Sequence, residues 1–258
     1  MVTELGTGVW WLDLGGVNAF LVDDPGREGG DGSESASESE SKPTSGGEAG
    51  DRSETGGGLT LIDAGTPRDA GTIARGITET GFSLSDVERV LVTHYDLDHV
   101  GALSRLSGLD APVSVGAADA GLLRGEHPNW ANHKGAIQFA TDPLVDEPAL
   151  DIRPIEDGTE IGGFRAYHTP GHTPGHVTYV NEARSAAFLG DLVMESNGEL
   201  SPSPWVISYD TGEVAGSIAA LANRVGEFDI CGMGHGVPFV RGGSDRLREC
   251  AERVTVEE

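Results

Sequence analysis

The chain contains few lysines and cysteines for its 258 residues. Lysine occurs only as Lys42 and Lys134, against 15 arginines and 42 acidic residues. The formal charge of -25 repels nucleic acids and anionic membranes, so neither is expected as a partner. A lysine-poor, acidic surface favours solubility in concentrated salt and predicts a halophilic protein, with an acidic mesophilic protein as the alternative.

Two cysteines, Cys231 and Cys250, are too few for a disulfide framework or a cysteine-rich zinc site. We expect free thiols in a reducing compartment, with Cys231 in the core. The opening MVTELGTGVWWLDLGG lacks the basic flank and apolar run of a signal peptide. No stretch has the ~20 apolar residues that span a bilayer. These features predict a cytoplasmic protein.

One low-complexity segment interrupts the strand-like sequence. Residues 24–58 are rich in Gly, Ser and Glu and nearly devoid of apolar side chains. Such a segment buries too little surface to offset its ordering entropy. Strand patterns lie on both sides, at 18–22 and 59–65. We therefore interpret residues 24–58 as a disordered acidic insertion within a hairpin of one domain that spans residues 1–258.

Runs of strand patterns alternate with helical patterns in both halves of the chain. Helices are expected over 66–81, 99–109, 210–225 and 244–254. Residues 125–150 show no clear periodicity and are interpreted as a loop-rich lid. This order favours a mixed sheet or a pair of sheets flanked by helices over one parallel doubly wound sheet.

Ligand-type residues follow apolar strands at four places, where loops on a rigid scaffold present chemistry. The stretch VTHYDLDHVG, residues 92–101, holds two histidines and two aspartates, and TPGHTPGH, GD and GHG follow it. Imidazole and carboxylate groups together suit zinc, iron or manganese. The seven candidate ligands are His94, Asp96, Asp98, His99, His172, Asp191 and His235.

The stretch THYDLDHVG resembles the His-x-His-x-Asp-His motif of the metallo-β-lactamase-fold hydrolases. TPGHTPGH, the GD after a strand and the late GHG continue the resemblance in order, and NAFLV and LIDAG resemble the opening strands. The resemblance implies an α/β (α+β) fold, a four-layer αβ/βα sandwich with two divalent metal ions at the sheet edge. Zinc is the expected metal, with iron or manganese as alternatives.

The same resemblance implies a role for each ligand. One metal would take His94, Asp96 and His172. The second metal would take Asp98, His99 and His235. Asp191 would bridge the two metals, with a water or hydroxide between them, so Asp98 and Asp191 are the expected catalytic residues. Asp63 would support the ligands from behind, with a simple turn cap as the alternative.

Asp96 stands where the family motif has its second histidine, an exchange that a minority of relatives share. A carboxylate in place of a neutral imidazole lowers the formal charge of the loaded cluster by one. We therefore expect a less electrophilic centre, a bound water with a higher pKa, and stronger competition from iron or manganese.

Other polar residues have less specific interpretations. His127, Trp130 and His133 lie in the expected lid and are candidates to touch substrate, with a solvated loop around one anchoring aromatic as the alternative. His168 and His176 flank the motif histidine at 172, and loop packing is expected for both.

The predicted function is metal-dependent hydrolysis of a small ester, thioester, lactone or phosphoester by a hydroxide bound to two metals. Hydroxyacylglutathione hydrolases of this family carry a C-terminal helical extension, and only 23 residues follow His235. The tRNA-processing relatives need a basic arm, which this acidic chain lacks. True β-lactamases act outside the cytoplasm, and the missing signal peptide disfavours that class. The alternatives are an iron-dependent oxidoreductase acting on sulfur or oxygen species, and a non-catalytic metal-binding module.

Overall fold

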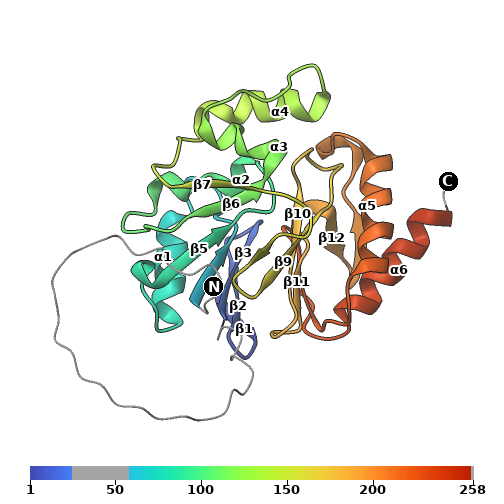
Figure 1. Cartoon of the computed structure of the whole chain (residues 1–258), viewed down its shortest axis with the longest axis horizontal. Helices are drawn as coiled ribbons and strands as arrows, with labels where there is room; N and C mark the ends of the chain where they lie inside the picture. Colours follow the sequence, from blue (N-terminus) through green and yellow to red (C-terminus); the bar gives the residue numbers. More distant parts are fainter. Residues whose placement is uncertain (25–57, 257–258) are drawn as a thin grey trace, which may run out of the picture.

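The computed structural model describes residues 1–24 and 58–256 and places two β-sheets face to face (Figure 1). The first sheet runs in chain order from β1 to β7, antiparallel as far as β4 and parallel from there on. Its strands are β1 (Val2–Gly6), β2 (Val9–Asp13), β3 (Asn18–Asp24), β4 (Gly58–Ile62), β5 (Val87–Leu91), β6 (Val113–Gly116) and β7 (Ile152–Ile155).

The second sheet has the order β14-β11-β10-β9-β8, with β14 parallel to β11 and the other pairs antiparallel. Its strands are β8 (Glu160–Ile161), β9 (Phe164–His168), β10 (Val177–Asn181), β11 (Ala186–Phe188) and β14 (Ile230–Gly232). A separate hairpin joins β12 (Val193–Ser196) to β13 (Glu199–Pro202).

Helices cover the outer faces of both sheets (Figure 1). The α-helices are α1 (Ala70–Glu79), α2 (Leu97–Val100), α3 (Ala117–Ala120), α4 (His133–Thr141), α5 (Thr211–Arg224) and α6 (Gly243–Val256). The short 3-10 helices are η1 (Leu84–Asp86), η2 (Leu103–Arg105), η3 (Leu122–Arg124), η4 (Asp142–Leu144), η5 (Gly190–Leu192) and η6 (Trp205–Ile207). In the described residues no helix is long and apolar enough to cross a membrane.

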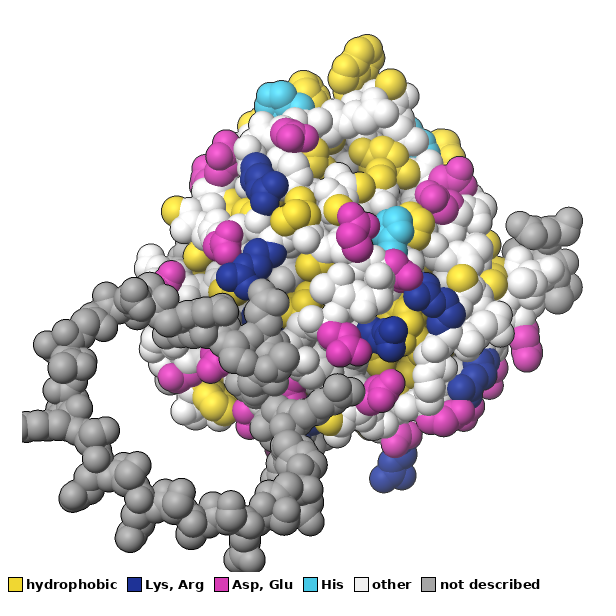
Figure 2. Space-filling model, in the orientation of Figure 1, with side chains coloured by type: hydrophobic (Ala, Val, Ile, Leu, Met, Phe, Trp, Pro, Cys, Tyr) yellow, Lys and Arg dark blue, Asp and Glu magenta, His cyan; other side chains and the backbone are white. Residues whose placement is uncertain are grey.

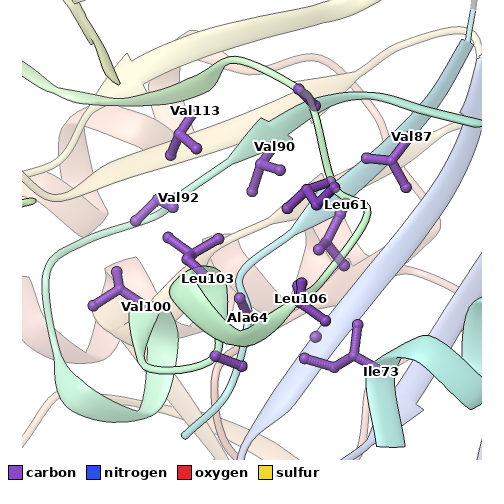
Figure 3. Close-up of a cluster of buried hydrophobic side chains, with 14 of the residues drawn as sticks. Leu61, Ala64, Ile73, Val87, Val90, Val92, Val100, Leu103, Leu106 and Val113 are labelled. Atoms are coloured by element: carbon purple, nitrogen blue, oxygen red, sulfur yellow. The ribbon is translucent and has the colours of Figure 1, made fainter. Parts of the chain in front are cut away.

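Three clusters of buried apolar side chains separate four layers. Ile73 of α1 packs in one cluster with Leu61 of the first sheet (Figure 3). Between the sheets, the rings of Phe20 and Phe188 lie 5.1 Å apart. Ile218 of α5 lies in the third cluster, outside the second sheet. The predicted four-layer αβ/βα sandwich is therefore confirmed.

Burial on both faces explains why the central strands are almost entirely apolar. In β3, Leu21 faces the helix-side cluster, whereas Phe20 and Val22 face the second sheet. Successive side chains of a strand point to opposite faces, so a strand between two cores needs apolar residues throughout.

Two predictions about helices were wrong. Residues 99–109 are not one helix but the end of α2 followed by η2. Residues 125–150, which we interpreted as loop-rich, contain helix α4. The sequence of this helix, HKGAIQFAT, inverts the usual apolar pattern. Lys134 and Gln138 are buried, whereas Ile137 and Phe139 are 43% and 47% exposed. Apolar periodicity therefore could not reveal this helix.

Most of the predicted disordered insertion, residues 24–58, lies outside the described residues, so its disorder stays a prediction. Its two end residues lie in strands, and Asp24 of β3 pairs with Gly58 of β4. The expectation that Cys231 belongs to the core is confirmed, and Cys250 is buried as well.

Candidate metal centre

Loops at one edge of the sandwich carry the seven predicted ligands. Residues 94–99 follow β5, and residue 172 lies between β9 and β10. Residue 191 lies in η5 after β11, and residue 235 follows β14. The strands therefore bring together side chains that are far apart in the sequence.

The candidate ligand atoms form two adjacent groups, in each of which they lie within 4.8 Å of one another. The first group is His94, His172 and Asp191, and the second is Asp98, His99 and His235. Oδ2 of Asp191 lies 3.7 Å from Nε2 of His172 and 3.2 Å from Nε2 of His235. Asp191 therefore belongs to the first group and also lies against a histidine of the second.

Each of the four histidines directs Nε2 toward the cluster and uses Nδ1 to hydrogen-bond a group outside it. The Nδ1 partners are Thr93 Oγ1 at 3.0 Å for His94, Asp63 Oδ2 at 2.9 Å for His99, Ser203 Oγ at 2.9 Å for His172, and the Gly16 carbonyl at 2.7 Å for His235. Such bonds fix the orientation of each ring and leave the Nε2 lone pair for a metal.

Asp63 enters the site through an uncommon backbone conformation with a φ of 57°. Its Oδ1 accepts a hydrogen bond from the Thr93 amide at 2.8 Å, and its Oδ2 accepts one from Thr93 Oγ1 at 2.7 Å. Oδ2 also accepts the bond from Nδ1 of His99 at 2.9 Å. Asp63 thus contacts the cluster from behind, where the family resemblance implied support.

The charges of the cluster shift the pKa values of its members. Burial, together with His99 and His172, lowers the pKa of His94 to about 4. Burial disfavours the charged form of His235, but Asp191 outweighs it and raises the pKa of His235 to about 9. Burial also disfavours ionised Asp191, yet His99 and His235 hold its pKa well below the usual range.

Asp96 lies beside the first group. Its Oδ2 is 3.1 Å from Nε2 of His172 and 3.3 Å from Nε2 of His94. The ammonium of Lys134 contacts the same oxygen, and Nε2 of Gln138 donates to Oδ1 at 2.9 Å. Burial raises the pKa of Asp96, but Lys134 and the two histidines outweigh it and hold that pKa well below its usual range.

Asp119 connects two of the ligand loops. Its Oδ2 accepts hydrogen bonds from the Tyr95 amide at 2.9 Å and from Thr173 Oγ1 at 2.7 Å. Its Oδ1 accepts a bond from the Gly175 amide at 2.8 Å. Because Tyr95 and Thr173 each adjoin a histidine of the first group, this buried carboxylate fixes the spacing between those histidines.

Gly234 allows the backbone to pass directly beside the cluster. A Cβ atom at this position would lie 1.9 Å from Oδ1 of Asp191 and 2.7 Å from Cε1 of His99. Glycine directly before His235, the first residue of GHG, is therefore a steric requirement of the site.

The residues present fit divalent cations. Nε2 of His99 and Oδ1 of Asp191 are buried 3.4 Å apart and have no hydrogen-bond partner among the described residues. Buried polar atoms without partners cost free energy, and a cation between them would remove that cost. Imidazole and carboxylate donors match zinc, iron and manganese.

The three predicted lid residues lie outside this cluster. His127 is exposed, with Nδ1 3.0 Å from Asp142 Oδ2, and Trp130 is 72% exposed. The ring of His133 stacks on Trp205 at 4.3 Å, and its Nε2 donates to the Trp205 carbonyl at 2.7 Å. Hydrophobic side chains project at the end of the molecule that carries α4 (Figures 1 and 2).

The two remaining histidines belong to neither ligand group: His168 is exposed at the end of β9, and His176 is buried before β10. Nε2 of His168 donates to the Pro174 carbonyl at 2.9 Å, and Nδ1 of His176 lies 2.9 Å from Thr169 Oγ1. The sequence interpretation missed Lys134 and Gln138. Their spacing of four residues and the rarity of lysine in this chain were the available signals.

Residues 53–226 match the sequence model of the metallo-beta-lactamase superfamily. The chain belongs to this superfamily. A member named "Probable metallo-hydrolase YflN", from Bacillus subtilis (strain 168), is 27% identical over 218 residues, which are 76% of this chain and 82% of that protein. The hydroxyacylglutathione hydrolase of Methylobacterium nodulans is 29% identical over 137 residues, 53% of this chain but only 45% of that protein.

Among solved structures, TTHA1623 in a di-iron-bound form is similar at a TM-score of 0.57 and 25% identity. The match covers 90% of this chain and 93% of TTHA1623. With metallo-hydrolases among its superfamily relatives, this protein is a metallohydrolase of the metallo-beta-lactamase fold. The fold binds divalent metals, and the two His and Asp groups are the candidate ligands.

Proposed function

We propose that this protein hydrolyses a small neutral ester or lactone at a centre of two divalent metal ions, with thioesters and phosphoesters as secondary substrates. The observation that carries the proposal is that Asp191 belongs to one ligand group and also lies against a histidine of the other. In this proposal His94, Asp96 and His172 would hold one metal, zinc in the first instance. Asp98, His99 and His235 would hold the other, and Asp191 would supply a carboxylate to both.

When bound, the metal ions supply Lewis acidity that activates water near neutral pH and polarises the group under attack. Asp98 is the most accessible carboxylate of the cluster, with 36% of its side chain exposed against 3% for Asp191. Oδ2 of Asp98 lies 3.5 Å from Nε2 of His235, whose side chain is 27% exposed. The site therefore opens beside these two residues, where Asp98 can hold the proton that leaves an attacking water.

Exposed apolar side chains support an uncharged organic substrate. Trp205 and Val206 are 63% and 59% exposed, and Trp205 lies two residues after Ser203, which hydrogen-bonds to His172. Val237, 58% exposed, lies two residues after the His235 ligand. These exposed apolar side chains lie close in sequence to residues of the site and are candidates to contact an apolar substrate. The net charge of -25 disfavours anionic phosphoesters relative to neutral esters and lactones.

The test starts with the full chain purified in concentrated KCl and analysed for bound metals. A panel of nitrophenyl esters, lactones, thioesters and phosphodiesters is then assayed before and after chelation. We expect ester or lactone turnover that chelation abolishes and added zinc or manganese restores. Asp191→Asn should abolish this activity, whereas Asp157→Asn, which alters an exposed partner of Arg224, should not. A metal-loaded protein without turnover on the panel would leave the non-catalytic module as the better account.

Iron chemistry is a second candidate, because TTHA1623 is similar to this chain and was crystallised with two irons. Asp96 also adds a carboxylate, which hard metals favour. Iron content and visible absorbance after aerobic purification distinguish the two candidates. A stable iron chromophore together with no ester or lactone hydrolysis would favour an oxidoreductase.

A further inference from the structure

Lys134 is a buried cation at the edge of the proposed metal centre. It is 4% exposed, and its ammonium contacts Oδ2 of Asp96. Lysine is almost never buried this deeply unless it is paired, so the contact with Asp96 accounts for its position. When the proposed metal centre is loaded, its two metal ions would also lie close to this ammonium.

Helix α4 positions this pair. The N-cap side chain of Asn132 accepts a hydrogen bond from the Lys134 amide at 2.9 Å and so fixes the first turn. Gln138 lies four residues later on the same face, and its Nε2 donates to Oδ1 of Asp96 at 2.9 Å. The hydroxyl of Tyr209 donates to Oε1 of Gln138 at 2.7 Å, which holds the amide with Nε2 toward Asp96.

We propose that Asp96 and Lys134 form one charge-neutral unit that takes the place of the neutral histidine of the family motif, with Lys134 and Gln138 as positioning residues. This inference rests on the proposed metal centre. Gln138 occupies Oδ1 and leaves Oδ2 directed at the histidines of the first group. Asp96 would then offer a metal one donor atom, as an imidazole does.

The charge balance changes the expectation drawn from the sequence. Counting Asp96 alone predicts a loaded centre one charge more negative than the histidine form, and therefore a less electrophilic one. Lys134 returns that charge from within contact distance of the same carboxylate. The loaded cluster then has the formal charge of the histidine form, and the expected loss of electrophilicity does not follow.

Three variants of the full-length protein test this coupling: Lys134→Met, Asp96→His and the double variant that carries both changes. Zinc affinity is measured by competition with a chelator, and cobalt-loaded protein is examined by visible absorption. We expect each single variant to bind zinc about 10–100-fold more weakly. Lys134→Met leaves the Asp96 carboxylate without its cation, and Asp96→His leaves the buried Lys134 ammonium without its carboxylate. The double variant should recover to within about threefold of the wild type, since its site is again neutral at this position.

If the loss of zinc affinity in the double variant equals the product of the losses in the two single variants, the inference is overturned. Wild-type zinc affinity and an unchanged cobalt spectrum in Lys134→Met would overturn it as well. Lys134→Arg, which keeps the charge, should retain more zinc than Lys134→Met, and equal losses in the two variants would contradict a role for charge.

Arg89→Met is the matched control, because Arg89 is also a buried cation, 6% exposed, but donates to Thr60 on a strand of the first sheet. This variant should lower the melting temperature and leave zinc affinity unchanged. A wild-type protein that binds no metal would overturn both the proposed function and this inference. A wild-type protein that binds two metals, with an unaffected Lys134→Met variant, would overturn this inference alone.

Discussion

Nδ1 of His99 and Oδ2 of Asp63 are joined by a 2.9 Å hydrogen bond at the back of the proposed metal centre. The same carboxylate binds the amide and hydroxyl of Thr93, whose Oγ1 lies 3.0 Å from Nδ1 of His94. One residue outside the two ligand groups therefore orients a histidine of each, directly for His99 and through Thr93 for His94.

Asp63→Ala should weaken metal binding about 10–100-fold, because both histidines lose the partner that fixes their rings. Metal retention after dialysis against a competing chelator measures the effect. Asp63→Asn keeps an acceptor for the Thr93 amide, so its metal retention should lie between those of the wild type and the alanine variant. Equal metal retention in all three proteins would show that Asp63 is only a turn residue.

Gly234→Ala should distort the cluster, because its Cβ would fall 1.9 Å from Oδ1 of Asp191. We expect loss of bound metal and a destabilisation of about 1–3 kcal/mol, measured by metal analysis and urea unfolding. Gly216→Ala in α5 is the control, since a Cβ there meets nothing within 4 Å and alanine favours a helix. If the two variants behave alike, the close approach at Gly234 has no functional consequence.

The metal-free protein should lose stability as the pH rises toward 9. The pKa of His235 is raised from 6.5 to about 9 in the fold, so the folded state holds a proton that the unfolded state releases. This contribution is fully present below about pH 6.5 and is lost as the pH rises through about 9. Its full size is about 3 kcal/mol. Urea unfolding of chelated protein between pH 6 and 10 measures it, and His235→Gln should show a flatter dependence over that range.

The melting temperature should rise with salt if the acidic surface is an adaptation to concentrated salt. Acidic side chains are spread over the face shown in Figure 2, so their mutual repulsion is not confined to one patch. Raising KCl from 0.1 to 1 M shortens the Debye length from about 10 to about 3 Å. The rise should therefore be steepest below about 1 M, and a flat melting temperature over that range would contradict a halophilic protein.

The layered fold and the positions of the candidate ligands could be predicted because they depend on local signals. Apolar strands bounded by Gly and Pro mark the sheets, and motif residues such as His94 and His172 lie in the loops that follow strands. The resemblance supplied the layer order and the pairing of ligands, which spacing alone could not. The roles of the individual ligands stay predictions, although the structure brings all seven together.

The surroundings of Asp96 could not be predicted from the sequence. Its contacts with Lys134 and Gln138 span about forty residues, and the four-residue spacing of these two side chains does not show which residue they contact. Helix α4 buries its polar side and exposes Ile137 and Phe139, the reverse of the pattern on which helix prediction depends. A rule based on apolar burial therefore interprets this segment as a loop.

The pairing of Asp24 with Gly58 has a consequence for how this protein could be shortened or extended. The two residues face each other across β3 and β4, so the chain leaves and re-enters the sheet at neighbouring points. Gly58 begins β4, whereas Asp63, next to the cluster, follows its far end. A deletion of residues 25–57, closed by a short turn, would preserve the strand register and leave the ligand loops unchanged. We therefore expect the number of residues between Asp24 and Gly58 to be variable without a change in metal binding.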